Sequence, residues 1–220
     1  MPGKEELEIQ RAYWNKEITQ FDAIYSHKKS RLSNWLDAVF RKDMYQRFEY
    51  TMKNAEPITD RTFLDVGCGT GIYTFELIQR GCRHVTGIDI SDVMIEQCNA
   101  AALKQHVQDK VTFVVGDLVH YPVGEKVDVC IGIGLFDYIE NPQPVLDKMR
   151  QCTRDKVIMS FPRFWTWRAP VRKVRLSLRG CPVYFYTQES VQTLLLNAGF
   201  ESYTIEKVGK LFCVTASLKN

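Results

Sequence analysis

Short apolar runs alternate with helical stretches along most of the chain after Asp60, and this alternation restricts the fold more than any other feature. The apolar runs are the expected strands, at 62–66, 84–90, 111–117, 126–134 and 156–161. Helical stretches at 72–80, 92–105 and 142–152 separate most of them. Strands alternating with helices of this length form βαβ units, in which helices cover both faces of a parallel sheet. The sequence therefore predicts a doubly wound α/β fold.

The C-terminal part of the chain follows a different pattern. Thr187 is expected to cap a helix that ends at Asn197, and Gly199 stands where a helix commonly ends in a left-handed residue. Two further strands are expected at 201–208 and 210–218, with only a short turn between them. Such a turn is too short for a crossover, so these two strands must be antiparallel. The predicted sheet thus has seven strands, of which the last is antiparallel.

The first expected strand leads into a glycine-rich turn, FLDVGCGTGIYTFEL at 63–77, with glycines at alternate positions. A dinucleotide-binding loop has the pattern G-x-G-x-x-G, and Ile72 stands where its third glycine would be. Asp65 at the strand end would repel a phosphate but would suit a ligand that carries an ammonium group. The turn therefore favours an ammonium-bearing ligand, and a tight turn without a ligand is the alternative.

This D-x-G-x-G-x-G pattern resembles motif I of the class I S-adenosylmethionine-dependent methyltransferases. The resemblance implies a Rossmann-like methyltransferase fold, which ends in an antiparallel strand, with S-adenosylmethionine as the cofactor and S-adenosylhomocysteine as the product. It also implies that Asp65 and the turn accept hydrogen bonds from the amino group of the cofactor. The residues concerned in the turn are Gly67, Cys68, Gly69 and Gly71, of which Cys68 is expected to pack beneath the cofactor.

Two further carboxylates end strands on the same side of the predicted sheet. Asp89 lies 18 residues beyond Gly71, where a carboxylate can accept hydrogen bonds from both ribose hydroxyls. Asp89 could instead cap the following helix, but Ser91 is better placed to do so. Asp117 suits the amino group of adenine, and a plain loop aspartate is the alternative. The other residues predicted to bind the cofactor are Ile90, Leu118 and Gly134.

The chemistry is expected beyond the fourth strand, in GIGLFDYIENP at 132–142. This segment lacks the N/D-P-P-Y/F/W motif of enzymes that methylate exocyclic amines of nucleic acids. Protein arginine methyltransferases resemble one another in a pair of glutamates nearby, whereas Glu140 is alone. Both classes are therefore disfavoured.

Short segments at 21–26, 41–47 and 135–142 resemble the magnesium-protoporphyrin O-methyltransferase branch. In that branch a lid tyrosine and a histidine are implicated in catalysis. The matching positions are Tyr25 and Asp137, and the aspartate departs from the branch, which puts a porphyrin substrate in doubt. Asp137 could act as a base toward an alcohol or phenol, is unnecessary if the acceptor is already a carboxylate, and could instead cap the next helix.

Positive charge is concentrated in two segments. The chain carries a net charge of +3, whereas residues 28–47 hold six basic and two acidic residues, and residues 163–179 hold six basic and no acidic ones. Localised charge of this kind indicates an anionic partner. The second segment also contains aromatic and aliphatic residues, which suits a membrane surface or an anionic substrate with apolar bulk; a solvated basic face is the alternative. The residues predicted to bind substrate are Tyr138, His120, Arg163, Arg168 and Arg172.

The expected organisation is one domain, 1–220. It is divided into a helical N-terminal lid (1–55), a cofactor-binding core (56–162), a basic aromatic insertion (163–182) and a C-terminal helix with antiparallel strands (183–220). The seven cysteines are scattered and no cluster has metal-ligand spacing, so we expect neither disulfides nor a metal. The chain lacks an apolar N-terminal run and a stretch of membrane-spanning length, which predicts a cytoplasmic protein with peripheral membrane contact through 163–179 as an option.

The expected function is methyl transfer to a small-molecule acceptor, at an oxygen of an anionic or lipid-like compound. Three alternatives stay open: N- or C-methylation of a small molecule, modification of nucleic acid through the basic surface, and cofactor binding without catalysis. A nucleic-acid partner would show binding that falls steeply with salt. An intact glycine turn does not exclude a regulator, because binding a cofactor and turning it over are separate properties. The oligomeric state is left open.

Overall fold

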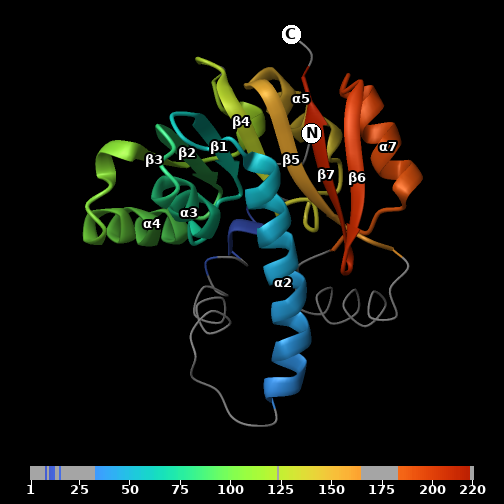
Figure 1. Ribbon diagram of the computed structural model, residues 1–220, viewed down its shortest axis with the longest axis horizontal. Coiled ribbons are helices and arrows are strands. Elements are labelled where there is room, and N and C mark those ends of the chain that lie inside the picture. The colour runs from blue at the N-terminus through green and yellow to red at the C-terminus, as the bar shows by residue number, and fades with distance from the viewer. Residues whose placement is uncertain are drawn as a thin grey trace.

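The computed structural model describes residues 8, 10–12, 15, 33–122, 124–164 and 183–218, and for residues 33–43 it describes the backbone alone. Seven strands form one sheet in the order β3-β2-β1-β4-β5-β7-β6 (Figure 1). Their bounds are Thr62–Val66 (β1), His84–Asp89 (β2), Val111–Val115 (β3), Val127–Gly132 (β4), Thr153–Pro162 (β5), Ser202–Val208 (β6) and Leu211–Ser217 (β7). The predicted α/β architecture is confirmed.

The strand directions are also as predicted. Strands β1 to β5 run parallel to one another, whereas β7 is antiparallel to both β5 and β6. The chain moves outward from β1 to β3 and then returns to place β4 on the other side of β1. In an open α/β sheet, ligands bind outside the carboxyl ends of the strands where the order reverses. Here that point lies between β1 and β4.

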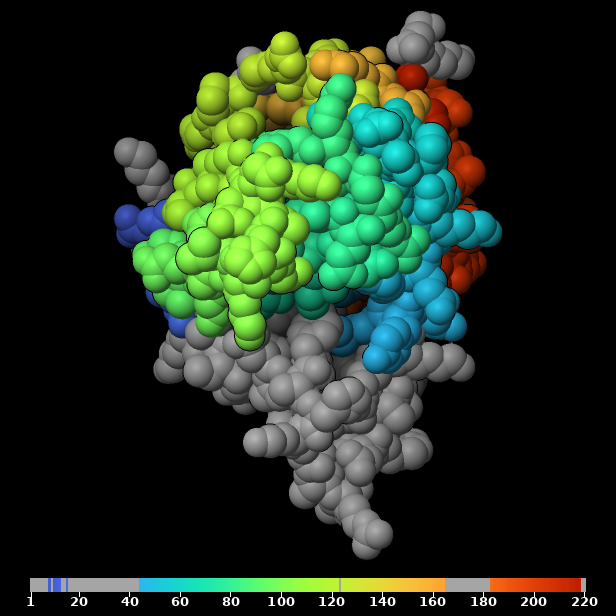
Figure 2. Space-filling model, turned by 60° about the vertical axis from the view of Figure 1, so that its left-hand side comes forward, coloured from blue at the N-terminus to red at the C-terminus, as the bar shows by residue number. Residues whose placement is uncertain are grey.

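Helices cover both faces of the sheet (Figure 1), and Figure 2 shows the side of the molecule where the cyan to yellow-green segments, from the end of α2 to β3, gather at the surface. Their bounds are Ser33–Ala55 (α2), Ile72–Gln79 (α3), Asp92–Lys104 (α4), Gln143–Gln151 (α5) and Gln188–Asn197 (α7). Apolar side chains of α2 and α3 form one buried cluster with the sheet, and those of α5 and α7 form another on the opposite face. No helix within the described residues is long and apolar enough to cross a membrane.

The expected helix ends agree with the structure. The side chain of Ser91 accepts a hydrogen bond from the Met94 N–H, and Thr187 forms a capping box with Ser190. Gly199 has a φ of 79°, the left-handed conformation predicted for it. These caps define where α4 begins after β2 and where α7 begins and ends.

Helix α2 is anchored on the sheet through its C-terminal half. The Tyr50 hydroxyl and Thr215 Oγ1 are 3.0 Å apart, and Lys156 Nζ donates to the Asn54 carbonyl at 3.0 Å. Met52 and Ala55 are buried against the same face. The N-terminal half of α2 extends past the lower edge of the sheet in Figure 1, so this helix, which ends the predicted lid of 1–55, reaches beyond the body of the protein.

Candidate functional site

The glycine turn that follows β1 is built around left-handed backbone. Gly67, Gly69 and Gly71 have φ values of 68°, 52° and 77°, which favour glycine over any other residue. A Cβ on Gly67 would lie 3.0 Å from Leu135 Cδ1, and one on Gly71 would lie 2.8 Å from the Phe75 ring. A Cβ on Gly69 would meet nothing within 4 Å. The turn is therefore closely packed on two sides and leaves room beside Gly69, as the backbone cradle of a ligand requires.

Asp89 at the end of β2 holds this turn in place. Its Oδ2 accepts from the Gly69 N–H and its Oδ1 accepts from the Ser91 N–H, both at 2.9 Å. Burial raises the pKa of this carboxyl group, and the backbone hydrogen bonds oppose that shift. Cys68 is also buried, and its sulfur lies 3.1 Å from the position of a Cβ on Gly87. The carboxylate predicted to bind ribose thus lies directly beside the open face of the turn.

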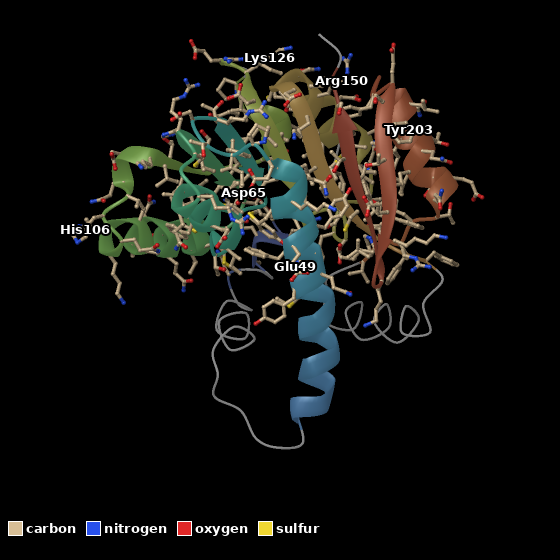
Figure 3. All side chains as sticks on the ribbon, viewed as in Figure 1. Glu49, Asp65, His106, Lys126, Arg150 and Tyr203 are labelled. Carbon is tan, nitrogen blue, oxygen red and sulfur yellow. The ribbon has the colours of Figure 1, made fainter. Side chains whose placement is uncertain are left out.

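Asp65 is buried inside the sheet, beside α2 in the view of Figure 3. Its Oδ2 accepts a 2.7 Å hydrogen bond from the Thr74 hydroxyl in the first turn of α3. Burial, and then the negative charge of Asp89, raise the pKa of Asp65 to about 7, although the Thr74 hydrogen bonds lower it. Asp65 and Asp89 are thus close enough for the charge of one to disfavour ionisation of the other, and such a pair of carboxylates would favour a cationic ligand.

The end of β3 holds the group predicted for adenine. Asp117 caps a 3₁₀ turn (Leu118–His120), accepts from the Val119 N–H, and has its Oδ2 3.0 Å from His120 Nδ1. His120 is largely exposed, so its pairing with Asp117 places it at the rim. Leu118 is 3 % exposed and packs in the core. Contacts of these residues with a ligand stay predictions.

The loop after β4 carries the residues predicted for the acceptor. Gly134 has a φ of 77°, and its N–H donates to the buried Ser160 hydroxyl at 2.9 Å. Asp137 is 6 % exposed, and its carbonyl accepts from the Tyr184 N–H. The Tyr186 hydroxyl donates to the carbonyl of Phe136 at 3.1 Å. Burial, and then the charge of Asp137, raise the pKa of Tyr186. The loop is therefore held from β5 and from the segment before α7.

The remaining residues predicted to bind substrate do not all lie in one place. Tyr138 is half-buried in the same loop. Arg163 donates to the Gly209 carbonyl at 3.0 Å and lies 5.5 Å from the Phe212 ring, so its guanidinium supports the turn between β6 and β7. Tyr25, Arg168 and Arg172 lie outside the described residues. Within the part of the chain that the structure describes, no group of three or more His, Cys, Asp or Glu residues has the arrangement of a metal site.

Residues near the N-terminus also reach the site. Gln10 is 7 % exposed and donates to the Tyr138 carbonyl at 2.7 Å, while Arg11 Nε donates to the Ile90 carbonyl at 2.7 Å. Asn15 Oδ1 accepts from the Ser91 hydroxyl at 2.5 Å. These contacts connect the described residues of the predicted lid to both the cofactor side and the acceptor side.

Gln10, Asn15, Thr74 and Ser160 were not predicted to belong to the site, and Arg47 was counted only as part of a basic segment. Arg47 extends from α2 toward the loop after β4, where its Nη1 lies 3.0 Å from the position of a Cβ on Gly134. Thr74 lies in the glycine-turn segment itself, nine residues after Asp65, and its place in the first turn of the following helix is the signal that could have identified it. The other residues join the site through contacts with distant segments, for which the sequence carries no signal.

Comparisons with known proteins agree with this geometry. Residues 63–156 match the model of a family described as a methyltransferase domain. A tRNA U34 carboxymethyltransferase of Shewanella halifaxensis is 25 % identical over 119 residues, which cover 54 % of this chain and 36 % of the relative. Protein arginine N-methyltransferase 1 of Saccharomyces cerevisiae is 38 % identical over 82 residues, which cover 36 % of this chain and 23 % of that protein. The chain spans about a third or less of the length of these curated relatives.

Several solved structures cover almost the whole chain. Magnesium protoporphyrin IX methyltransferase from Synechocystis PCC 6803, solved with bound S-adenosylhomocysteine, has a TM-score of 0.78 at 20 % identity and covers 96 % of this chain and 99 % of its own. Geranyl diphosphate C-methyltransferase from Streptomyces coelicolor A3(2) has a TM-score of 0.73 at 13 % identity, and covers 99 % of this chain and 98 % of its own. At these identities the likeness concerns the fold.

Proposed function

Because this chain belongs to the class I S-adenosylmethionine-dependent methyltransferases, we propose that it transfers a methyl group from S-adenosylmethionine to a small-molecule acceptor. The observation that carries the proposal is the glycine turn, in which the Gly69 N–H is held by Asp89 and the space beside Gly69 is open. The carboxylates of Asp65 and Asp89 near that space suit the ammonium group and the ribose of this cofactor. They would repel the phosphates of a dinucleotide.

The proposed binding of the cofactor follows the carboxyl edge of the sheet. Asp65 and the backbone of Gly67 to Gly71 would meet the methionine part, and Asp89 would accept from the ribose hydroxyls. Asp117 would accept from the adenine amino group. Ile90, Leu118 and Gly134 would complete the site. Asp117 Oδ1 already accepts from the Val119 N–H, and Asp117 Oδ2 lies 3.0 Å from His120 Nδ1, so this assignment requires one of the two oxygens to accept a second hydrogen bond.

When bound, the cofactor supplies a methyl group on a sulfonium, and the protein mainly has to position the acceptor and exclude water. Asp137 lies in the loop beyond β4, on the side where the strand order reverses. We propose that this carboxylate takes the proton from a hydroxyl acceptor, with Tyr25 contributing from the lid. Its burial at 6 % exposure fits a group that is reached only from inside the site.

We propose an anionic or amphiphilic acceptor that is methylated on oxygen. The support is the concentration of positive charge in two segments that together carry +10 in a chain of net charge +3. The relatives act on tRNA and on protein arginine, and one structural neighbour is a C-methyltransferase, so methylation of nitrogen, carbon or nucleic acid are the competing outcomes. The segment 163–179, most of it outside the described residues, would supply any peripheral contact with a membrane.

The first test is calorimetric titration with S-adenosylmethionine, S-adenosylhomocysteine and NAD in parallel. We expect the first two to bind with micromolar dissociation constants and NAD not to bind, because the carboxylates beside the turn repel its phosphates. Methyl transfer would then be measured against anionic phenols, carboxylates and phosphates, with tRNA as a further arm. Binding of NAD alone would contradict the proposal.

Asp137 provides a separate test of the chemistry. Replacing it with asparagine should lower the turnover of a hydroxyl acceptor by about 100-fold, the usual contribution of a general base, and leave the affinity for S-adenosylhomocysteine within about threefold. Replacing Glu140, an exposed carboxylate in the same loop, should change neither. If Asp137→Asn turned over at the wild-type rate, the carboxylate would have a structural role.

A further inference from the structure

The position of Arg47 is determined by the anchored half of α2. Its carbonyl accepts a 2.8 Å hydrogen bond from the Thr51 hydroxyl one turn later, and Thr51 is fully buried. From there to Ala55 the helix packs on the sheet, with the Tyr50 hydroxyl paired with Thr215 of β7. The backbone of Arg47 therefore cannot shift without displacing the core contacts of α2.

The side chain of Arg47 extends from that point into the space beside the loop after β4. Its Nη1 and Cζ lie 3.0 and 3.8 Å from the position that a Cβ on Gly134 would occupy. The guanidinium also donates a hydrogen bond to the Tyr73 hydroxyl, and its Nε is buried. Since Gly134 has left-handed backbone and no side chain, the guanidinium can lie directly against that backbone.

The same two contacts bring Arg47 next to the glycine turn. Leu135, which follows Gly134, places its Cδ1 3.0 Å from the Cβ position of Gly67. Tyr73 is the second residue of α3, the helix that begins directly after the turn. Phe48 of α2 packs on Tyr73 with their ring centroids 5.6 Å apart. The guanidinium thus lies between the two segments that would enclose the methionine part of the cofactor.

The charges in this region have opposite signs on its two sides. Burial raises the pKa of Tyr73, the positive charge of Arg47 opposes that shift, and the negative charge of Asp65 adds to it. The Tyr73 hydroxyl therefore lies near enough to both the Arg47 guanidinium and the Asp65 carboxylate for each charge to affect its pKa. The methionine part of S-adenosylmethionine has a matching pair of charges, since its ammonium and its carboxylate are attached to one carbon. Asp65 suits the ammonium, and a guanidinium suits a carboxylate through paired N–H donors.

We propose that Arg47 binds the carboxylate of the cofactor and so selects ligands that carry it. This inference rests on the proposed function, because it presumes that the turn holds S-adenosylmethionine. A carboxylate or phosphate of the acceptor is the other source of the same chemistry near Gly134. The two sources are separable, because the carboxylate of the cofactor can be removed without changing its adenosine.

The test is a calorimetric comparison of S-adenosylhomocysteine with its decarboxylated analogue on the wild type, Arg47→Gln and Arg80→Gln. We expect the wild type to prefer the carboxylate-bearing ligand by about 30-fold, in the range of a charge-assisted hydrogen-bonded pair. In Arg47→Gln the preference should fall to about threefold or less, with the analogue bound as in the wild type. Arg80 pairs with Glu76 at the end of α3, so Arg80→Gln should keep the full preference.

The possible results separate the inference from the function on which it rests. If Arg47→Gln kept the 30-fold preference, the carboxylate would be bound elsewhere and the inference would be overturned. It would also be overturned if Arg47→Gln instead lost the binding of benzoate or phenyl phosphate to the S-adenosylhomocysteine-saturated protein. If the wild type bound neither cofactor analogue, the proposed function would fail as well. Should Arg47→Gln not fold, Arg47→Lys provides the test, because lysine keeps the charge but not the paired donors. A preference well below 30-fold in Arg47→Lys would support the assignment, and an unchanged 30-fold preference would overturn it.

Discussion

Replacing Asp89 with alanine should weaken the binding of S-adenosylhomocysteine by about 100-fold or more, which corresponds to roughly 3 kcal/mol. Asp89 accepts from the N–H groups of Gly69 and Ser91 and is the residue proposed to accept from the ribose. Its loss would therefore remove the ligand's partner and release the turn at the same time. Calorimetric titration of both proteins measures the change directly.

A matched control and a second ligand separate these two effects. Glu96 is an exposed carboxylate of α4, so Glu96→Ala should bind S-adenosylhomocysteine as the wild type does. A 2′-deoxyribose analogue of S-adenosylhomocysteine lacks one of the proposed hydrogen bonds to Asp89. The wild type should discriminate against this analogue, and Asp89→Ala should not. Equal affinity of Asp89→Ala and wild type for S-adenosylhomocysteine would remove Asp89 from the proposed site.

Replacing Asp65 with asparagine should stabilise the protein without ligand and weaken cofactor binding. The pKa of Asp65 is raised from 3.8 to about 7 by burial and by the neighbouring Asp89. Because the folded protein holds this proton more tightly than the unfolded chain does, the protonated group contributes to the free energy of unfolding. That contribution is fully present below about pH 4 and is lost as the pH rises through about 7. At pH 8 the ionised carboxylate costs on the order of 4 kcal/mol, and asparagine removes that cost while it can still pair with Thr74.

The expected gain in unfolding free energy is therefore largest at pH 8 and smaller at pH 5, as denaturant titration at both pH values would show. At pH 8 we expect at least about 2 kcal/mol, since the amide must still be satisfied in the core. Affinity for S-adenosylhomocysteine should fall by about 10-fold or more, because the amide cannot pair with the ammonium as a charge does. A variant that was less stable than the wild type at pH 8 would contradict this account.

Asp128 provides a control of opposite sign. Partial burial would raise its pKa, but hydrogen bonds from Thr62 and the charge of Arg61 lower it overall. A lowered pKa contributes stability above about pH 4, and that stability is lost as the pH falls. Asp128→Asn should thus destabilise the protein at pH 8, where Asp65→Asn stabilises it.

Residues that lie far apart in the sequence could not be assigned to the site in advance. Asp65, Asp89 and Asp117 were predicted because each ends a strand, and parallel strands bring their carboxyl ends to one edge. Arg47 and Ser160 carry no such signal, since their contacts with Gly134 depend on how α2 and β5 pack. Arg163 was predicted to bind substrate, whereas its guanidinium contacts Gly209 and Phe212, and that binding stays a prediction.

Local patterns in the sequence determined the strand and helix types, the sheet with its final antiparallel strand, the caps at Ser91 and Thr187, and the left-handed turn at Gly67, Gly69 and Gly71. Periodicity, capping and glycine spacing act between residues that are close in the chain, so they can be recognised without a structure. Tertiary structure decided which charges face one another: it buried Asp65, paired Asp117 with His120 and directed Arg47 to Gly134. Burial and distance control the strength of a charge, and both arise only when distant segments pack together.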